Sequence, residues 1–203
     1  YMMSFQASGP HASDRAMEVI AMGVELSSSV PSRAEWIKPM GKFDLKLEKT
    51  FLSIPKGIGL VIGCSTFPVW NTVPGLFADL ITGNPAIVKP HPKAVLPIAI
   101  VIAEIRHALQ AAGFDANVVQ MAVDTSDAPQ TKELAEHPQV KLIDFTGGNA
   151  FGDYIESLTG KTTFTEKAGV NCAIIDSAVD FKSVAGNLAF SACLYSGQMC
   201  TAP

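Results

Sequence analysis

The 203-residue sequence lacks the features that mark several classes of protein. No segment reaches the roughly 20 consecutive apolar residues of a membrane-spanning helix, since even the run from Val95 soon meets a proline and a charge. There is no stripe rich in Lys and Arg, and the net charge is −4, which argues against nucleic-acid binding. The four cysteines form no C-x-x-C pair and do not cluster with the four histidines, which argues against a metal site and a disulfide framework. We therefore expect no membrane, nucleic-acid or metal partner, and a cytoplasmic location.

The chain begins with Tyr rather than Met, and its first ten residues lack the basic flank and apolar region of a secretory signal. We expect it to be a fragment of a longer polypeptide.

The composition, 48 % hydrophobic and 17 % charged, is typical of a folded globular protein. From about residue 57, short runs rich in Val and Ile alternate with segments of helical spacing. This alternation predicts an α/β fold whose parallel sheet is buried on both faces by helices. Strands are expected at residues 59–63, 86–89, 117–123, 140–145 and 171–176. Helices are expected at about 97–112, 128–136, 150–158 and 181–195.

The first 55 residues have a different texture. They predict a helix over about residues 13–26, a polar break at "SSSVPS", and an exposed strand or hairpin in the alternating segment 42–54. We expect this part to pack outside the main sheet or against another subunit.

Two glycine-rich segments invite a dinucleotide-binding interpretation. "GIGLVIG" at Gly57 has the wrong spacing and precedes a strand, so it indicates a turn. In "FTGG", Gly147 and Gly148 lie between a strand and a helix, where backbone N–H groups bind anions such as a pyrophosphate. An ordinary glycine turn explains "FTGG" equally well.

"IVKPHPK" places Lys89, His91 and Lys93 after a strand, at the sheet edge where α/β proteins bind ligands. A solvated basic turn is an equal alternative. Glu166, after a short β-like run, is by itself more typical of a surface residue than of a catalytic base.

The cysteines differ in context. Cys172 and Cys193 lie in apolar segments and are expected in the core, and Cys64 is interpreted as a small apolar residue at a strand end. Cys200 lies in the turn "YSGQMC", where backbone N–H groups would lower the pKa of its thiol and stabilise an oxyanion. Its context supports a nucleophile and a structural cysteine equally.

From about residue 54 onward, four motifs resemble those of the aldehyde dehydrogenase superfamily, in the same order. They are "FPVWNTVPGLFADLITGNPAIVKP", "FTGG", "EKAG" and "SGQMC". The wording of "FTEKAGVN" and "LAFSACLYSGQMCTAP" is most similar to the dehydrogenases of phenylacetate degradation, which oxidise a ring-opened semialdehyde carried on coenzyme A.

The resemblance implies a Rossmann-like NAD(P)-binding domain over residues 1–168, with 1–55 peripheral, and the start of a catalytic domain over residues 169–203. Lys89 would hold the adenine ribose, and Gly147 and Gly148 would lie at the pyrophosphate. Cys200 would be the nucleophile that forms a thioester, and Glu166 the base that activates water to release a carboxylate.

Three positions depart from the family pattern. Thr66 stands where the family has an Asn that donates to the oxyanion, and Gly148 replaces a common Ser. Pro92 stands where members that prefer NAD carry an acidic residue. Because Lys89, His91 and Lys93 would surround a 2′-phosphate without a like charge, we expect NADP to be preferred, with NAD as the alternative.

Two other functions remain open: a CoA-acylating aldehyde dehydrogenase, and a non-catalytic cofactor-binding fragment. We expect the parent protein to act on a small aldehyde, which the phenylacetate resemblance makes CoA-linked, and to be a homo-oligomer. The isolated fragment is expected to fold but to be inactive.

Overall fold

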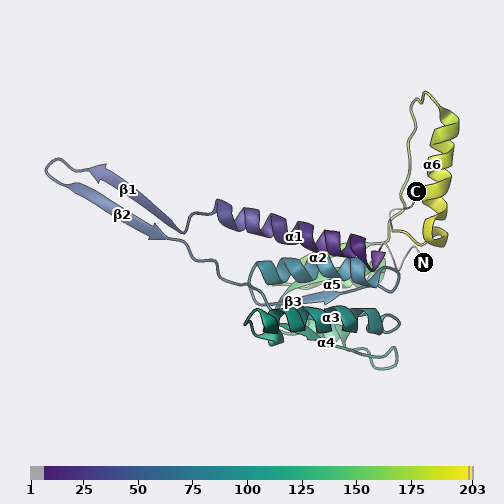
Figure 1. Ribbon diagram of the computed structural model, residues 1–203, viewed down its shortest axis with the longest axis horizontal. Helices are drawn as coiled ribbons and strands as arrows, with labels where there is room; N and C mark the ends of the chain where they lie inside the picture. Colours follow the sequence, from purple (N-terminus) through teal and green to yellow (C-terminus); the bar gives the residue numbers. More distant parts are fainter. Residues whose placement is uncertain (1–6, 201, 203) are drawn as a thin grey trace.

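The computed structural model describes residues 7–200 and 202 (Figure 1). Its body is a parallel five-stranded sheet with the strand order β5-β4-β3-β6-β7. The strands are β3 (Ile58–Ile62), β4 (Ala86–Lys89), β5 (Val119–Met121), β6 (Val140–Gly147) and β7 (Thr162–Lys167). None of the described helices is long and apolar enough to cross a membrane.

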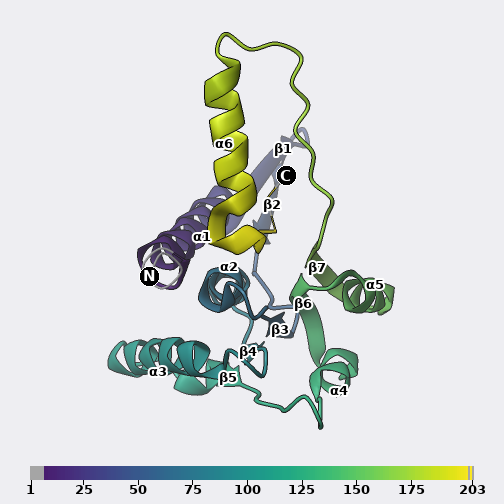
Figure 2. The ribbon, with the colours of Figure 1, turned by 90° about the vertical axis from the view of Figure 1, so that its right-hand side faces the viewer.

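Helices cover both faces of the sheet (Figure 2). On one side lie α2 (Pro68–Ile81) and α3 (Val95–Ala111), and on the other lie α4 (Thr131–Glu136) and α5 (Asn149–Ser157). The central strand β3 explains the two layers, because Val61 packs with α2 and α3 while Leu60 and Ile62 pack with α4 and α5. All three side chains are buried, so the predicted Rossmann-like α/β fold is confirmed.

The strand order creates a crevice at one edge of the sheet. The chain builds outward from β3 to β4 and β5, with the short helix η2 (Ala116–Val118) just before β5, and then returns to place β6 on the other side of β3. The loops that follow β3 and β6 therefore run in opposite directions. Ligands of open α/β sheets bind at such a switch point, outside the carboxyl ends of the strands.

The N-terminal part stands apart from the sheet. Helix α1 (Pro10–Ser29) packs on α2 through the buried Ala12 and Ala16. Beyond it, β1 (Arg33–Pro39) and β2 (Asp44–Thr50) form an antiparallel hairpin that extends away from the body (Figure 1). Of the two alternatives for residues 42–54, an exposed strand or a hairpin, the exposed strand is confirmed as β2, and its partner β1 lies outside the predicted range.

Three predictions for the C-terminal part are wrong. Residues 171–176 form no strand, and Ile174 is 92 % exposed. Cys172 and Cys193 are exposed rather than in the core. The reason is that β7 already ends the described sheet, and α6 (Phe181–Cys193) buries none of its residues against the described chain. An apolar sequence alone therefore did not predict whether these residues have a packing partner.

Candidate active site

A pocket of about 520 Å³ opens at the switch point, and we name it the thiol pocket. It brings together Thr66, Glu166 and Cys200, three residues that the sequence singled out and that come from distant segments. Its lining consists of residues 64–67, 71, 146–147, 166–169, 171, 192, 197–200 and 202.

A turn with an unusual backbone carries Cys200 into this pocket. After α6 the short helix η3 (Leu194–Gly197) has three successive residues with positive φ: 52° at Tyr195, 60° at Ser196 and 73° at Gly197. Such angles are costly for residues with a side chain, so other contacts must hold the turn. The ring of Tyr195 packs edge-on against Phe67 at the start of α2, with 5.2 Å between ring centroids.

Asn171 provides a second restraint. Its side-chain Nδ2 donates to the backbone oxygen of Cys200 at 2.7 Å and to that of Ala202 at 2.9 Å. The segment after β7 is thereby joined to the turn that carries the thiol.

The electrostatic environment of Cys200 differs from the sequence-based expectation. Burial and a hydrogen bond to Glu166, together with the charge of Glu166, raise the pKa of the thiol to about 11. A backbone N–H group acts in the opposite direction but more weakly. The turn thus acts in the predicted direction, but the expected net lowering of the thiol pKa is wrong, because burial and then Glu166 outweigh the turn. The thiol is protonated at neutral pH and needs a base.

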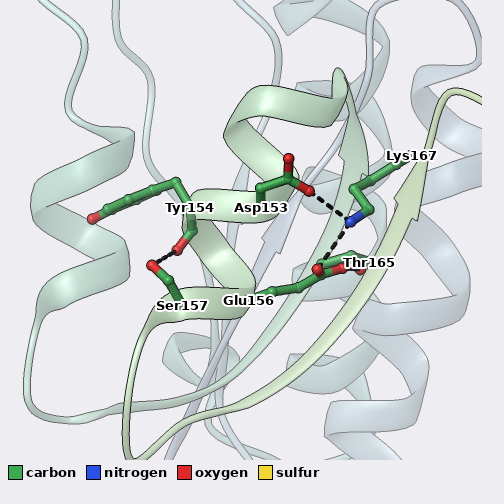
Figure 3. Close-up of polar contacts among 6 residues, drawn as sticks. All are labelled: Asp153, Tyr154, Glu156, Ser157, Thr165 and Lys167. Carbon is green, nitrogen blue, oxygen red and sulfur yellow. Dashed lines mark hydrogen bonds and ion pairs between the residues drawn. The ribbon is translucent and has the colours of Figure 1, made fainter.

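The direction of Glu166 follows from its two neighbours on β7. Thr165 and Lys167 point to the opposite face of the strand and contact α5 (Figure 3). Lys167 Nζ lies 2.8 Å from Asp153 Oδ1 and 2.9 Å from Glu156 Oε2, and Thr165 donates to the same Glu156. With both neighbours held on α5, alternation along the strand directs Glu166 into the thiol pocket.

Thr66 lies in the loop after β3, just before the N-terminus of α2. Its Oγ1 is 3.6 Å from Cys64 Sγ, which also accepts from the Phe67 backbone N at 3.4 Å and from Asn71 Nδ2 at 3.5 Å. Sequence reasoning missed Asn71, although it also lines the pocket. The sequence feature that could have indicated Asn71 is its spacing of four residues from Phe67, because side chains so spaced lie on the same face of a helix.

A smaller pocket of about 180 Å³ adjoins Cys200, and we name it the apolar pocket. Its lining is mostly aromatic and aliphatic: Ala7, His11, Phe67, Trp70, Asn71, Tyr195, Met199 and Cys200. It can accept the apolar part of a molecule whose reactive carbon lies at the thiol.

A third cavity, of about 640 Å³, lies beside the thiol pocket, and we name it the lysine pocket. It contains all the predicted cofactor-binding positions, namely Lys89, His91, Pro92, Gly147 and Gly148. Its full lining is residues 62–65, 89, 91–92, 124–126, 129, 131–132, 145–148 and 151. Lys93 does not line it and is exposed.

Gly148 is the N-cap of α5, and a Cβ atom added there would meet no atom within 4 Å. The helix N-terminus therefore remains open to an anion such as a pyrophosphate.

The lysine pocket also contains a carboxylate that the sequence did not indicate. Asp124, in the loop after β5, lies with its Oδ1 2.5 Å from Lys89 Nζ. Lys89 is 4 % exposed and Asp124 is 8 % exposed, so this is a buried ion pair. The premise that no like charge would face a 2′-phosphate beside Lys89 is thus wrong, because a residue distant in sequence supplies the charge.

The residues present fit a dinucleotide. A glycine-lined helix N-terminus suits the pyrophosphate, and the buried Lys89 has hydrogen-bond donors for a ribose. Asp124 Oδ1 is buried and, apart from the ion pair, has no hydrogen-bond partner in the described part of the chain. Over residues 7–200 and 202, no group of three or more His, Cys, Asp or Glu side chains is placed to hold a metal ion.

Comparison with known proteins identifies the family. Residues 12–203 match the model of the aldehyde dehydrogenase family. A crystal structure of an NAD-dependent aldehyde dehydrogenase from Burkholderia multivorans is 52% identical, with a TM-score of 0.92 over 100% of this chain and 37% of that one. A 1-pyrroline-5-carboxylate dehydrogenase from Geobacillus thermodenitrificans (strain NG80-2) is 31% identical over 161 residues, covering 75% of this chain and 30% of the relative.

A more distant structure shares the fold. It is glyceraldehyde-3-phosphate dehydrogenase GapN from Methanocaldococcus jannaschii DSM 2661, complexed with NADP. It is 20% identical, with a TM-score of 0.72 over 99% of this chain and 44% of that one. The chain thus spans about a third of the length of the two more similar relatives. The match over residues 12–203 is decisive, and this chain belongs to the aldehyde dehydrogenase family.

Proposed function

We propose that this chain supplies the cofactor-binding part and the nucleophile of an enzyme that oxidises an aldehyde to a carboxylate with NAD or NADP. The cofactor-binding domain comprises residues 1–168, and residues 169–203 begin the catalytic domain. The observation that carries the proposal is the convergence of Cys200, Glu166 and Thr66 on one pocket, next to a second pocket that fits a dinucleotide.

The first step begins with the protonated thiol. Cys200 donates its proton to Glu166, and the resulting thiolate sulfur forms a bond to the aldehyde carbon. The carbonyl oxygen becomes an alkoxide, which Thr66 and Asn71 stabilise by donating hydrogen bonds from the wall of the pocket.

The dinucleotide, when bound, supplies the hydride acceptor. Lys89 and Asp124 would hold its ribose, and the backbone N–H groups at Gly147 and Gly148 would hold its pyrophosphate. The former aldehyde carbon loses its hydrogen as a hydride ion while its C=O bond re-forms, which leaves a thioester on Cys200. Glu166, after releasing its first proton to solvent, takes a proton from water, whose oxygen bonds to the thioester carbon. The C–S bond then breaks, which frees the Cys200 thiolate and the product acid, and the acid ionises to the carboxylate.

For the substrate, we propose a semialdehyde of phenylacetate catabolism that is linked to coenzyme A. The resemblance of the segments around Glu166 and Cys200 to that group of dehydrogenases supports this choice. The apolar pocket beside Cys200 supports a substrate with an uncharged end next to its aldehyde. Turnover of 1-pyrroline-5-carboxylate in preference to such a semialdehyde would contradict the proposal.

Release of the thioester to coenzyme A instead of water is the second candidate reaction. Glu166 in the thiol pocket favours hydrolysis, because transfer to a thiol needs no carboxylate to activate water. Product analysis distinguishes a free carboxylate from an acyl-CoA.

The parent enzyme is further proposed to be a homo-oligomer. The β1–β2 hairpin exposes four large apolar side chains. Their exposed fractions are 50 % for Trp36, 51 % for Ile37, 47 % for Met40 and 64 % for Phe43. A second subunit would bury them.

The deciding experiment compares Cys200→Ala with Cys193→Ala in the full-length protein. Cys200→Ala should abolish aldehyde oxidation and leave dinucleotide affinity unchanged, since no other nucleophile replaces the thiol. Cys193→Ala, at an exposed cysteine on α6, should retain activity. Full activity of Cys200→Ala would refute the proposed function.

A further inference from the structure

The ion pair between Lys89 and Asp124 lies where the proposed function places the adenine ribose, so this inference rests on that function. The two residues come from different parts of the sheet. Lys89 ends β4, and Asp124 follows β5, which pairs with β4 in parallel. Parallel pairing therefore brings both side chains to the same carboxyl edge, inside the lysine pocket.

Asp124 is held firmly in this position. Its Oδ2 accepts from the backbone N of Gln130 at 2.9 Å and lies 3.4 Å from Thr131 Oγ1. Hydrogen bonds from Lys89 and Gln130 outweigh the effect of burial and hold the pKa of Asp124 below its usual range. The carboxylate is therefore charged at neutral pH and cannot easily turn away.

Its other oxygen retains free acceptor capacity. Oδ1 faces Lys89 at 2.5 Å but has no further hydrogen-bond partner among the described residues. Lys89 Nζ also donates to the Pro90 carbonyl at 3.0 Å, which leaves one of its three donors. The pair thus offers one acceptor and one donor side by side, which matches the neighbouring hydroxyl groups of a ribose.

A 2′-phosphate would meet a different environment. The Lys89 charge is already balanced by Asp124, and the carboxylate would repel a dianion. His91 adds little positive charge, because burial and the neighbouring Lys89 and Lys93 lower its pKa, and its Nδ1 already accepts from the Lys93 backbone N at 3.1 Å. Lys93 itself lies outside the pocket lining.

We infer that Asp124 is a specificity-determining residue, which selects a dinucleotide with free ribose hydroxyl groups and rejects one that carries a 2′-phosphate. The expected preference is therefore for NAD, in contrast to the preference for NADP that the local sequence around Pro92 suggested. Discrimination arises from a repulsive charge as well as from an added hydrogen bond.

The test measures binding of NAD and NADP to the full-length protein by calorimetry, without substrate. The wild type should bind NAD roughly tenfold or more tightly than NADP. Asp124→Asn should reduce this ratio by a similar factor. Asp127→Asn removes an exposed carboxylate from the same loop that does not line the pocket, and it should leave the ratio unchanged.

Since Asp124→Asn leaves a buried lysine without its partner, a double variant, Lys89→Gln with Asp124→Asn, provides a second route. It replaces the ion pair by two neutral amides of similar shape and should also lose the preference for NAD. Tighter or equal binding of NADP by the wild type overturns the inference, and so does an unchanged ratio in the two Asp124 variants. If the wild type binds neither dinucleotide, the proposed function itself fails, and the inference fails with it.

Discussion

Asn171 holds the turn of Cys200 through its side-chain amide, which donates to the backbone oxygen of Cys200 at 2.7 Å and of Ala202 at 2.9 Å. Asn171 lies just after β7, in the segment of the chain that follows Glu166. Glu166 and Cys200, the proposed base and nucleophile, are thus linked through a few residues of the same segment.

Replacement of Asn171 by Asp should lower kcat in the full-length enzyme by roughly ten- to a hundredfold, because a carboxylate cannot donate to the two carbonyl groups and the thiol loses its position. Dinucleotide affinity should not change. Asn187→Asp makes the same chemical change at an exposed position on α6 and serves as the control. A wild-type kcat in Asn171→Asp would show that the turn needs no such restraint.

Replacement of Glu166 by Gln should make the Cys200 thiol ionise at lower pH. Glu166 contributes to the raised thiol pKa of about 11 through its hydrogen bond and its charge, and Gln removes the charge. The rate of alkylation by iodoacetamide, followed at the Cys200 peptide by mass spectrometry, should therefore rise at lower pH in the variant. The exposed Cys172, measured in the same samples, controls for reagent reactivity. An unshifted profile would remove Glu166 from the environment of the thiol.

At a pH at which the Cys200 thiol of the variant is itself ionised, the same Glu166→Gln variant should slow hydrolysis of the thioester more than its formation, since the water loses its base while the sulfur no longer needs one. Rapid mixing of enzyme, aldehyde and dinucleotide should show a burst of reduced dinucleotide followed by slow turnover. A steady-state rate equal to that of the wild type would contradict the role of Glu166 as the base.

Asp79 should make the folded protein less stable as the pH rises. Burial, with a smaller effect of Asp144, raises the pKa of Asp79 to about 7, so the folded state keeps a proton that the unfolded chain releases above pH of about 4. The free energy of unfolding therefore falls between these two values, by up to about 1.4 kcal/mol per pH unit. Asp79→Asn should remove this contribution and stabilise the protein by a few kcal/mol at pH 8 but little at pH 4.

Urea unfolding at the two pH values measures the effect, and Asp14→Asn, at an exposed position on α1, is the control. Equal pH dependence in Asp79→Asn and the wild type would show that Asp79 ionises normally in the folded state.

Gly152→Ala should impair activity more than stability. A Cβ atom at Gly152 would lie 2.4 Å from Lys167 Cδ, which forces the lysine away from Asp153 and Glu156 and loosens β7 next to Glu166. Alanine favours the helix by about 1 kcal/mol, whereas exposed ion pairs contribute little, so the melting temperature should hardly fall. We expect a several-fold loss of kcat. Lys167→Met removes the ion pairs of Lys167 directly and should reproduce that loss. Full activity of both variants would show that these contacts do not orient Glu166.

The sequence allowed the central strands to be predicted because their burial on both faces leaves a continuous apolar run, as in residues 59–63 and 86–89. The same criterion failed at residues 171–176, because a run of apolar residues does not say whether a neighbouring strand exists to pair with. Strand β1 was missed since its residues do not alternate, and only pairing with β2 makes it a strand.

The candidate site was predictable to the extent that its residues lie in local motifs. Glu166 and Cys200 were singled out because "EKAG" and "SGQMC" resemble family motifs, since their local context alone left both roles open, and the structure brings both into the thiol pocket. Asp124 was not found, because it reaches Lys89 through the pairing of β5 with β4 and no local count of residues reveals that contact. The raised pKa of the thiol was likewise missed, since it depends first on burial in the fold and then on a carboxylate that is close only in space.

The order of strands along the chain bears on how the protein is made. All five strands of the sheet lie between Ile58 and Lys167, and the central strand β3 is synthesised first. Each later strand then adds at an outer edge, on one side and afterwards on the other, without opening a pair that has already formed. Lys167 leaves the ribosome before Cys200 does, so a nascent chain can complete the described strands and the lysine pocket before the thiol of Cys200 emerges.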